Sequence, residues 1–204
     1  MVCMSLISDL DHNLAIKMLD FNPPYWADQL LRVCTYLGDS RLMIILIPLL
    51  GLYLQQSKGW KACLVFILLS STACLTCESI KHLVNRQRPE INLMRLDGIK
   101  LPTSPSFPSG HTFSAAALYP GFAIIIARLS AFPTLRILFP VFGISIALLV
   151  AFTRIYLGVH FLSDVIAGLL GGFTFALTMG YLVLPKRTTT PVKIDFKQES
   201  QSAS

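Results

Sequence analysis

Two histidines and a carboxylate stand among basic residues in three short polar clusters of this sequence. The clusters contain, in chain order, Lys81 and Arg88; Ser109, Gly110 and His111; and Arg154, His160 and Asp164. An imidazole can attack phosphorus or move a proton, and a carboxylate can fix the orientation of a ring. A phosphoryl group in transfer spreads negative charge over its oxygens, which fixed cations stabilise. The three clusters together therefore indicate phosphoryl-transfer chemistry.

Five apolar runs without a charged residue surround these clusters. They cover 42–57, 62–77, 112–127, 137–153 and 165–185. Hydrophobic residues make up 53% of the chain and charged residues 14%, against about 25% charged residues in soluble domains. Most runs are shorter than a hydrocarbon core, but flanking Lys and Arg side chains can reach the interface and extend each helix by about a turn. The sequence therefore predicts five membrane-spanning helices.

The order of these helices predicts that the clusters meet. If all five runs span, alternation places the connection after the second and the connection after the fourth on one membrane face. Lys81 and Arg88 are spaced to lie on one side of a helix that Pro89 ends. His160 and Asp164 would lie on one face of the last helix if it begins early enough. One surface should then hold all three clusters.

The first 40 residues carry a different pattern. Leu6, Leu10, Leu14 and Met18 recur every four residues between polar ones, and after Pro24 a second amphipathic stretch contains Trp26 and Leu30. We predict two helices lying in the interface. A sixth spanning segment is the alternative, and its acidic residues make it costly.

The predicted fold class is all-α, an integral membrane helical bundle of five spanning helices preceded by two interfacial amphipathic helices. The predicted regions are interfacial helices over 1–40, a transmembrane catalytic domain over 41–185 and a disordered cytoplasmic tail over 186–204.

The three clusters resemble the signature of the type 2 phosphatidic acid phosphatase family, K-x6-R-P, P-S-G-H and S-R-x5-H-x3-D. The matching residues are Lys81, Arg88 and Pro89; Pro108 to His111; and Arg154, His160 and Asp164. Thr153 replaces the usual Ser of the third motif and keeps a hydroxyl. The resemblance implies a small bacterial-type lipid phosphatase.

Roles for these residues follow from their chemistry and from the resemblance. His160 is the expected nucleophile, Asp164 orients its ring, and His111 protonates the leaving oxygen and then activates water. The expected phosphate-binding residues are Lys81, Arg88, Ser109, Gly110 and Arg154. Ser109 and Gly110 precede a helix whose N-terminal amides favour an anion.

No metal or cofactor is expected. The acidic residues Glu78, Glu90 and Asp97 are dispersed, and Glu78 is the expected ion-pair partner of Lys81. The net charge of +6 comes from basic residues scattered at the ends of apolar runs, which argues against nucleic-acid binding. The expected partner is a membrane lipid substrate, with no obligatory protein partner.

Several functions remain open at this point. The first is hydrolysis of a lipid phosphate or pyrophosphate, with undecaprenyl pyrophosphate as the preferred substrate. The second is a phosphotransferase in which a lipid hydroxyl, such as one on lipid A, replaces water. The third is a catalytically silent protein that binds or flips lipid, which retention of both histidines disfavours. A vanadium haloperoxidase is disfavoured by the membrane helices.

Charge predicts the orientation. Opposite the clusters lie eight cations and two acids, mainly in short connections and the C-terminal tail. Positive residues close to helix ends favour the cytoplasm. We therefore expect the inner membrane of a cell as the location, with the active site on the extracytoplasmic face.

Overall fold

The structure, a computed structural model, describes residues 2–95 and 102–183 and is all-helical in these ranges. The predicted all-α class is therefore confirmed. Seven α-helices and two short 3-10 helices are described: α1 (Val2–Asp20), α2 (Tyr25–Cys34), η1 (Thr35–Gly38), α3 (Ser40–Lys58), α4 (Trp60–Val84), η2 (Ile91–Leu93), α5 (Gly110–Leu129), α6 (Pro133–Tyr156) and α7 (Leu162–Leu182). The predicted tail over 186–204 lies outside the described residues.

Helices α3 to α7 are the five described helices that are long and apolar enough to cross a membrane, as predicted. Helices α3 to α6 are each longer than the charge-free run on which the prediction rested, whereas α7 has the same length as its run and begins three residues earlier. Arg41 and Lys58, for example, lie in the first and last turns of α3. Long basic side chains can keep their charge at the interface while their stems cover apolar surface, so a helix continues past its last uncharged residue.

The centre of the bundle is α5, which packs closely against α6 and α7. Small residues permit this approach. A Cβ on Gly172 of α7 would lie 2.5 Å from the carbonyl oxygen of Phe113, and a Cβ on Gly143 of α6 would lie 2.8 Å from that of Tyr119. Small residues at helix contacts are typical of membrane bundles, in which backbones approach closely. This contact fixes the start of α5 beside the start of α7.

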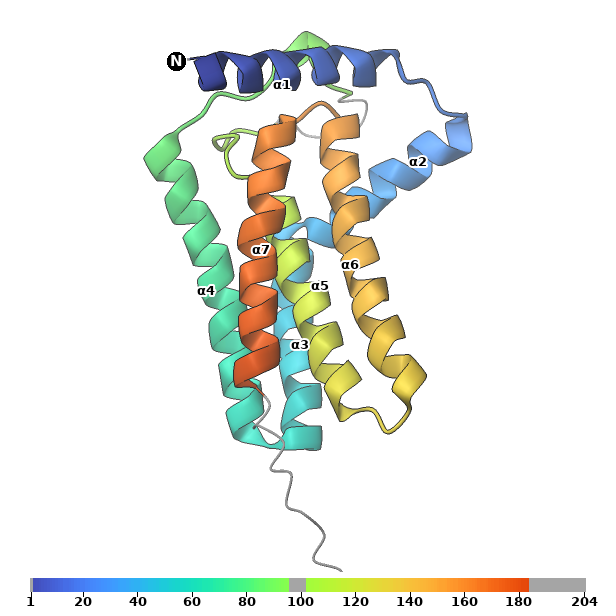
Figure 1. Ribbon diagram of the computed structural model, residues 1–204, viewed down its shortest axis with the longest axis vertical. Helices are drawn as coiled ribbons and strands as arrows, with labels where there is room; N and C mark the ends of the chain where they lie inside the picture. Colours follow the sequence, from blue (N-terminus) through green and yellow to red (C-terminus); the bar gives the residue numbers. More distant parts are fainter. Residues whose placement is uncertain (1, 96–101, 184–204) are drawn as a thin grey trace, which may run out of the picture.

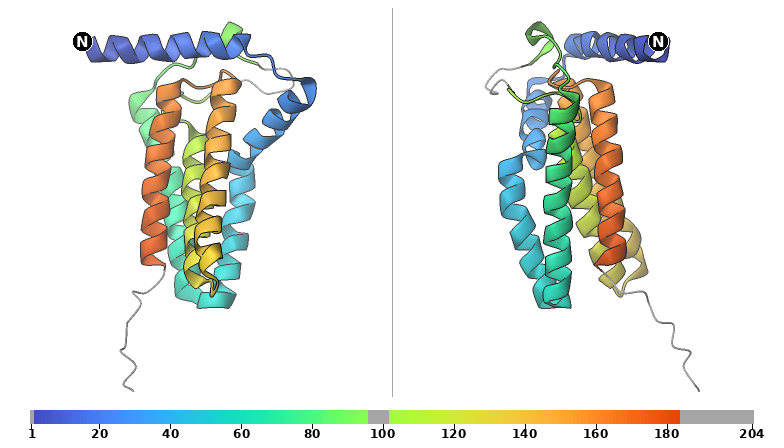
Figure 2. Two further views of the ribbon diagram at one scale, coloured as in Figure 1. Left: turned by 45° about the vertical axis from the view of Figure 1, so that its right-hand side comes forward. Right: turned by 90° about the vertical axis from the view of Figure 1, so that its left-hand side faces the viewer.

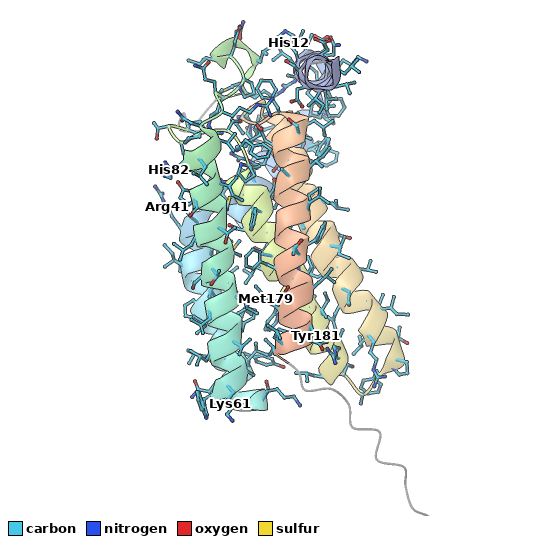
Figure 3. The ribbon with its side chains drawn as sticks, turned by 60° about the vertical axis from the view of Figure 1, so that its left-hand side comes forward. His12, Arg41, Lys61, His82, Met179 and Tyr181 are labelled. Carbon is cyan, nitrogen blue, oxygen red and sulfur yellow. The ribbon has the colours of Figure 1, made fainter. Side chains whose placement is uncertain are left out.

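The spanning helices alternate in direction, so the ends of α4 and α6 and the starts of α5 and α7 share one end of the bundle (Figure 1). Helix α1 lies across this end, and α2 slopes from it toward α3 (Figures 1 and 2). His12 and His82 lie toward this end, whereas Lys61 lies at the opposite one (Figure 3). The three polar clusters of the sequence therefore meet at the end that α1 covers.

The rest of the protein covers only part of the predicted apolar face of α1. Leu14 and Met18 are partly buried, but Leu6 and Leu10 are 57% and 63% exposed. Among residues 6–20 of α1, the most buried side chain is a carboxylate, Asp11, at 2% exposure. A carboxylate is buried only where charged or polar partners compensate it. The placement of α1 and α2 in a membrane interface stays a prediction.

Candidate active site

The first cluster comes together differently from the prediction. Helix α4 ends at Val84, and its C-cap Asn85 has a left-handed backbone with φ of 44°. Arg88 therefore lies in the segment beyond the helix, and the expectation that Lys81 and Arg88 share a helical face ended by Pro89 is wrong. Asparagine adopts the left-handed conformation more readily than most residues and commonly ends helices there. The turn at Asn85 brings the chain back toward the bundle.

Ser104 joins the two cations instead. Lys81 Nζ donates to Ser104 Oγ at 3.3 Å, Arg88 Nη2 donates to the same hydroxyl at 3.2 Å, and Arg88 Nε donates to the carbonyl of Ser104 at 2.8 Å. Glu78, the predicted ion-pair partner of Lys81, does pair with it, with Oε2 4.0 Å from Nζ, and its side chain is half exposed. The two cations are therefore held by a loop residue that no motif contains.

The second cluster forms the start of α5. Ser109 is the N-cap residue, but its hydroxyl makes no capping bond and pairs with the hydroxyl of Thr112 at 3.0 Å. Ser109 is fully buried, so the expected phosphate donor is turned away from the cavity described below. A Cβ on Gly110 would lie 3.2 Å from Lys81 Nζ, so the glycine keeps this ammonium close to the helix N-terminus. Partial positive charge at that N-terminus adds to the charge of Lys81.

His111 follows Gly110 in the first turn of α5 and faces a carboxylate that the motifs do not include. Its Nε2 lies 3.7 Å from Oδ2 of Asp39, the N-cap residue of α3. Both side chains are about a quarter exposed, at 28% and 26%. Asp39 therefore offers a negative counter-charge beside the imidazole.

The third cluster places His160 just before α7 and not on it, because the helix begins at Leu162. The expected pairing with Asp164 nevertheless occurs: Nδ1 of His160 lies 3.6 Å from Oδ2 of Asp164. Ser106 bridges the pair, with its Oγ 3.3 Å from Nδ1 and hydrogen-bonded to the same Oδ2. Asp164 Oδ2 also accepts from the backbone N–H of Phe161 at 2.9 Å. The carboxylate therefore fixes both the helix start and the imidazole.

Hydrogen bonding assigns the tautomer of His160. Arg88 Nη1 lies 3.1 Å from Nε2, and a guanidinium can only donate, so Nε2 accepts and Nδ1 carries the proton toward Ser106 and Asp164. Burial lowers the pKa of His160 from 6.5 to about 3, the bond with Asp164 opposes this shift, and Arg154 and Arg88 add to it. The ring is therefore neutral at physiological pH, with a lone pair on Nε2.

Arg154 completes the group of cations. Its side chain is buried, its Nη1 donates to Thr35 Oγ1 at 2.7 Å, and its Nε has no hydrogen-bond partner among the described residues. A buried donor without a partner is costly, so this N–H is suited to an incoming anion. The neighbouring Thr153, expected to keep a donor for the site, instead donates to the carbonyl of Val150 at 2.7 Å.

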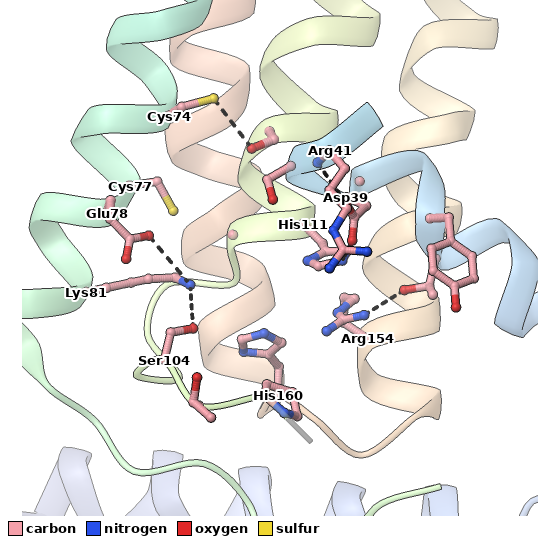
Figure 4. A pocket seen from close by; sticks show the side chains of 18 of the residues that line it. Asp39, Arg41, Cys74, Cys77, Glu78, Lys81, Ser104, His111, Arg154 and His160 are labelled. Atoms are coloured by element: carbon pink, nitrogen blue, oxygen red, sulfur yellow. Dashed lines mark hydrogen bonds and ion pairs between the residues drawn. The ribbon is translucent and has the colours of Figure 1, made fainter. Parts of the chain in front are cut away.

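These side chains surround one cavity of about 700 Å³. Figure 4 shows Lys81, Ser104, His111, Arg154 and His160 pointing into a common space. The cavity is also lined by Arg88 and Gly110, whereas Asp164 and Ser109 lie behind the lining. The arrangement of two imidazoles among cations suits a compact, multiply charged anion.

Six further residues lie near the site, and no motif or periodic pattern in the sequence predicts that they do. They are Asp11, Thr35, Asp39, Arg86, Ser104 and Ser106. Ser104 and Ser106 lie in the Pro- and Ser-rich connection before α5, and composition of that kind predicts a loop without predicting its path. Among the described residues, no group of three or more His, Cys, Asp or Glu side chains could hold a metal ion.

This chain is similar to known proteins of one family. The model of the PAP2 superfamily matches residues 60–188. Phosphatidylglycerophosphatase B of Bacillus subtilis is 32% identical over 161 residues, which cover 78% of this chain and 74% of the relative. Decaprenylphosphoryl-5-phosphoribose phosphatase of Mycobacterium tuberculosis is 36% identical over 95 residues, covering 47% of this chain and 46% of the relative.

A solved structure has the same architecture. The crystal structure of a transmembrane PAP2-type phosphatidylglycerolphosphate phosphatase from Bacillus subtilis superposes with a TM-score of 0.71 at 30% identity, covering 87% of this chain and 84% of that one. The matched family region contains all three polar clusters and four of the five candidate spans. This chain is therefore a multi-pass membrane protein that belongs to the PAP2 superfamily of lipid phosphate phosphatases.

Proposed function

We propose that this chain hydrolyses the phosphate ester of a membrane lipid through a phosphohistidine on His160. The observation that supports this most directly is the state of His160: its Nδ1 faces Ser106 and Asp164, and its Nε2 faces Arg88 in the cavity. A neutral imidazole with a fixed tautomer is a ready nucleophile, because no proton has to leave before attack.

The first step forms the Nε2–P bond of His160 and breaks the bond from phosphorus to the lipid oxygen. His111 in its protonated form donates a proton to that departing oxygen, which leaves as the lipid alcohol or, where the substrate is a pyrophosphate, as the lipid monophosphate. The negative charge of Asp39, 3.7 Å from Nε2 of His111, offsets part of the repulsion between the protonated ring and the cations that line the cavity.

In the second step a water molecule attacks the phosphohistidine, His111 accepts one of its protons, and the P–N bond breaks. His160 returns to its neutral form and inorganic phosphate is released. Both steps pass through a phosphoryl group with charge on three equatorial oxygens. Lys81, Arg88 and Arg154 supply the compensating positive charge, and the unpartnered Nε of Arg154 is one donor available for it.

The names of the relatives guide the choice of lipid. The relative that matches 78% of this chain is named for phosphatidylglycerophosphate, which makes a glycerolipid monophosphate the first substrate to test. Undecaprenyl pyrophosphate, preferred from the sequence, is the second. All candidates share a phosphate on a lipid tail, and none requires a cofactor in the proposed chemistry.

The test is phosphate release by the purified protein in detergent, measured for phosphatidylglycerophosphate, phosphatidate and undecaprenyl pyrophosphate in the presence of EDTA. We expect turnover of at least one lipid without added metal, and inhibition by vanadate, which adopts the five-coordinate geometry of the transferred group. Activity lost in EDTA and restored by magnesium would contradict the proposed chemistry.

A parallel assay with a lipid alcohol as acceptor addresses the phosphotransferase alternative. Hydrolysis predicts that free phosphate accounts for all of the released phosphoryl groups. Transfer to the alcohol in preference to water would replace the hydrolase proposal.

A further inference from the structure

Arg86 connects two buried carboxylates at the end of the bundle that carries the site. Its Nη1 donates to Oδ1 of Asp164 at 2.6 Å, and its Nη2 donates to Oδ2 of Asp11 at 2.8 Å. Asp164 is fully buried and Asp11 is 2% exposed, while the Arg86 side chain is 28% exposed. The guanidinium also lies over the ring of Phe161, with its carbon 4.6 Å from the centroid. Arg86 is thus a fixed group and not a free headgroup ligand.

Asp11 in turn fastens α1 to the first turn of α7. Its Oδ1 accepts from the backbone N–H of Ser163 at 2.9 Å, and its Oδ2 accepts from the hydroxyl of the same serine. A carboxylate at a helix N-terminus is stabilised by the free N–H groups and by the helix dipole. The two donors of Ser163 and the guanidinium of Arg86 therefore compensate the burial of Asp11. The bonds to Ser163 also place α1 directly over the start of α7.

The contacts of Asp164 show what this arrangement can control. Oδ1 is used by Arg86, whereas Oδ2 faces His160, Ser106 and the N–H of Phe161. With Oδ1 held, the carboxylate cannot rotate without losing a charged hydrogen bond. Its Oδ2 therefore stays directed at Nδ1 of the nucleophile.

We propose that Arg86 and Asp11 are positioning residues, which hold Asp164 in the orientation that fixes the ring of His160, so that the seating of α1 sets the geometry of the nucleophile. This inference rests on the proposed function. Asp11 lies outside the matched family region of 60–188, so the chain supplies this support from its own N-terminal helix. Neither residue lines the cavity, so neither is placed to touch substrate.

Removing Arg86 should change kcat and leave KM nearly unaltered. The cations that line the cavity remain, so ground-state binding of phosphate is kept, while the nucleophile loses its fixed orientation. Misplacing a reacting group by about 1 Å costs on the order of a hundredfold in rate. We expect Arg86→Gln to lower kcat by about tenfold to a hundredfold, with KM within about twofold.

The charges around His160 also predict a shift in its titration. Arg88, Arg154 and Asp164 face the ring, and Arg86 partly neutralises Asp164. Without Arg86, the negative charge of Asp164 acts on the ring with less compensation, which raises the pKa of His160. The acidic limb of kcat/KM should then move to higher pH in Arg86→Gln.

Arg95→Gln is the matched control. Arg95 also holds α1, through the carbonyls of Met18, Leu19 and Phe21, but it has no contact with Asp164. If Arg86 acts through Asp164, Arg95→Gln retains kcat within about threefold and an unshifted pH profile. Equal losses in both variants would mean that docking of α1 matters and the contact with Asp164 does not, which would overturn the proposal.

A double-variant comparison tests the connection to α1. Asp11→Asn removes a charge with little change in shape and should lower kcat by several-fold in the parent. In the Arg86→Gln background it should have no further effect, because residues that act through one chain of contacts are not additive. If the losses in kcat multiply in the double variant, Asp11 and Arg86 act independently. That result would contradict the proposal that Asp11 acts on Asp164 through Arg86.

The orientation and protonation of the His160 ring can be measured without any phosphatase activity, so the positioning role of Arg86 can be tested separately from the proposed function. Histidine-selective ¹⁵N NMR in detergent, with His160 assigned from its Ala variant, reports the tautomer and titration of the ring. We expect Arg86→Gln to move the His160 signals and Arg95→Gln to leave them in place. Unchanged His160 signals in Arg86→Gln would overturn the positioning role, whereas a parent protein without phosphatase activity would overturn only the proposed function.

Discussion

The carboxylate of Asp39 lies 3.7 Å from Nε2 of His111, which places an acidic residue at the start of α3 against the proposed general acid of α5. Asp39 also accepts from the backbone N–H of Arg41 at 2.8 Å and so caps α3. Asp39 therefore has two roles: it caps α3, and it places a negative charge beside His111. A substitution that keeps the cap and removes the charge can separate these roles.

Asp39→Asn should keep the helix cap and remove the counter-charge. Asparagine caps helices about as well as aspartate, so folding is retained. A poor leaving group needs the proton of His111 more than a good one. We expect kcat to fall by about tenfold for an alkyl phosphate and by much less for p-nitrophenyl phosphate. The control is Asp20→Asn on the exposed end of α1; equal losses for both substrates would argue against a role in proton transfer.

His160→Ala should abolish phosphate release, because no neighbouring side chain replaces a nucleophilic imidazole. His82→Ala is the control, since His82 is 72% exposed and contacts Glu78 on the outside of α4. In His111→Ala, a substrate with a good leaving group should still phosphorylate His160, and the acid-labile intermediate should accumulate because its hydrolysis lacks a base. Initial rates of His160→Ala within a few-fold of the parent would exclude the phosphohistidine route.

The buried His160 should also make the fold acid-sensitive. Its pKa is lowered by burial to about 3, against about 6.5 in an unfolded chain, so between these values the unfolded state binds a proton that the folded state does not. Stability is therefore lost as the pH falls through this window. From about pH 6.5 to 5 the loss is about 2 kcal/mol, or roughly 4 to 8 °C in Tm.

His160→Asn removes this titration and keeps a polar side chain. The Tm of the variant in detergent should therefore fall less between the same two pH values than that of the parent. The comparison isolates one ring, since the other three histidines remain. Parallel declines in both proteins would mean that His160 does not titrate as its burial implies.

The sequence could predict the spanning helices, which follow from composition, and the end of the bundle at which the polar clusters meet, which follows from the alternating direction of those helices. The charge-free runs predicted α3 to α7, and the alternation of their directions predicted that Lys81, His111 and His160 would meet. Neither inference needs the path of a loop. The turn at Asn85 and the start of α7 at Leu162 do depend on local capping, so the helical placement of Arg88 was wrong, and α7 does not begin early enough to include His160.

The surrounding contacts could not be predicted for a different reason. Ser104 and Ser106 reach the site because their loop folds back over the bundle, and Asp11 and Asp39 reach it because α1 and α3 are packed against that end. Each contact joins residues far apart in the sequence and has no periodic signature. Arg86 lies within the first motif of the sequence. Its contact with Asp11, however, depends on the position of α1 over the bundle, which the sequence does not predict.

The distribution of basic residues predicts the side of the membrane that the site faces. At the end opposite the site, Lys58 and Lys61 flank the single residue between α3 and α4, and Arg128 lies before the short turn into α6. Positive residues in short connections favour the cytoplasmic side. The end that α1 covers carries more balanced charge, because Arg86 and Arg32 are paired with Asp11 and Asp28. We therefore expect the cavity to open on the extracytoplasmic side.

Single cysteines placed at each end test this orientation in an active variant that lacks the five native cysteines. Ile91 in η2 is 63% exposed at the site end, and Ser57 lies in the last turn of α3 at the other end. A membrane-impermeant thiol reagent on intact cells should label Ile91→Cys and spare Ser57→Cys, and permeabilised cells should label both. Labelling of Ser57→Cys alone in intact cells would place the chemistry in the cytoplasm. The substrate would then be a lipid phosphate of the inner leaflet, and undecaprenyl pyrophosphate released on the outer surface would no longer be a candidate.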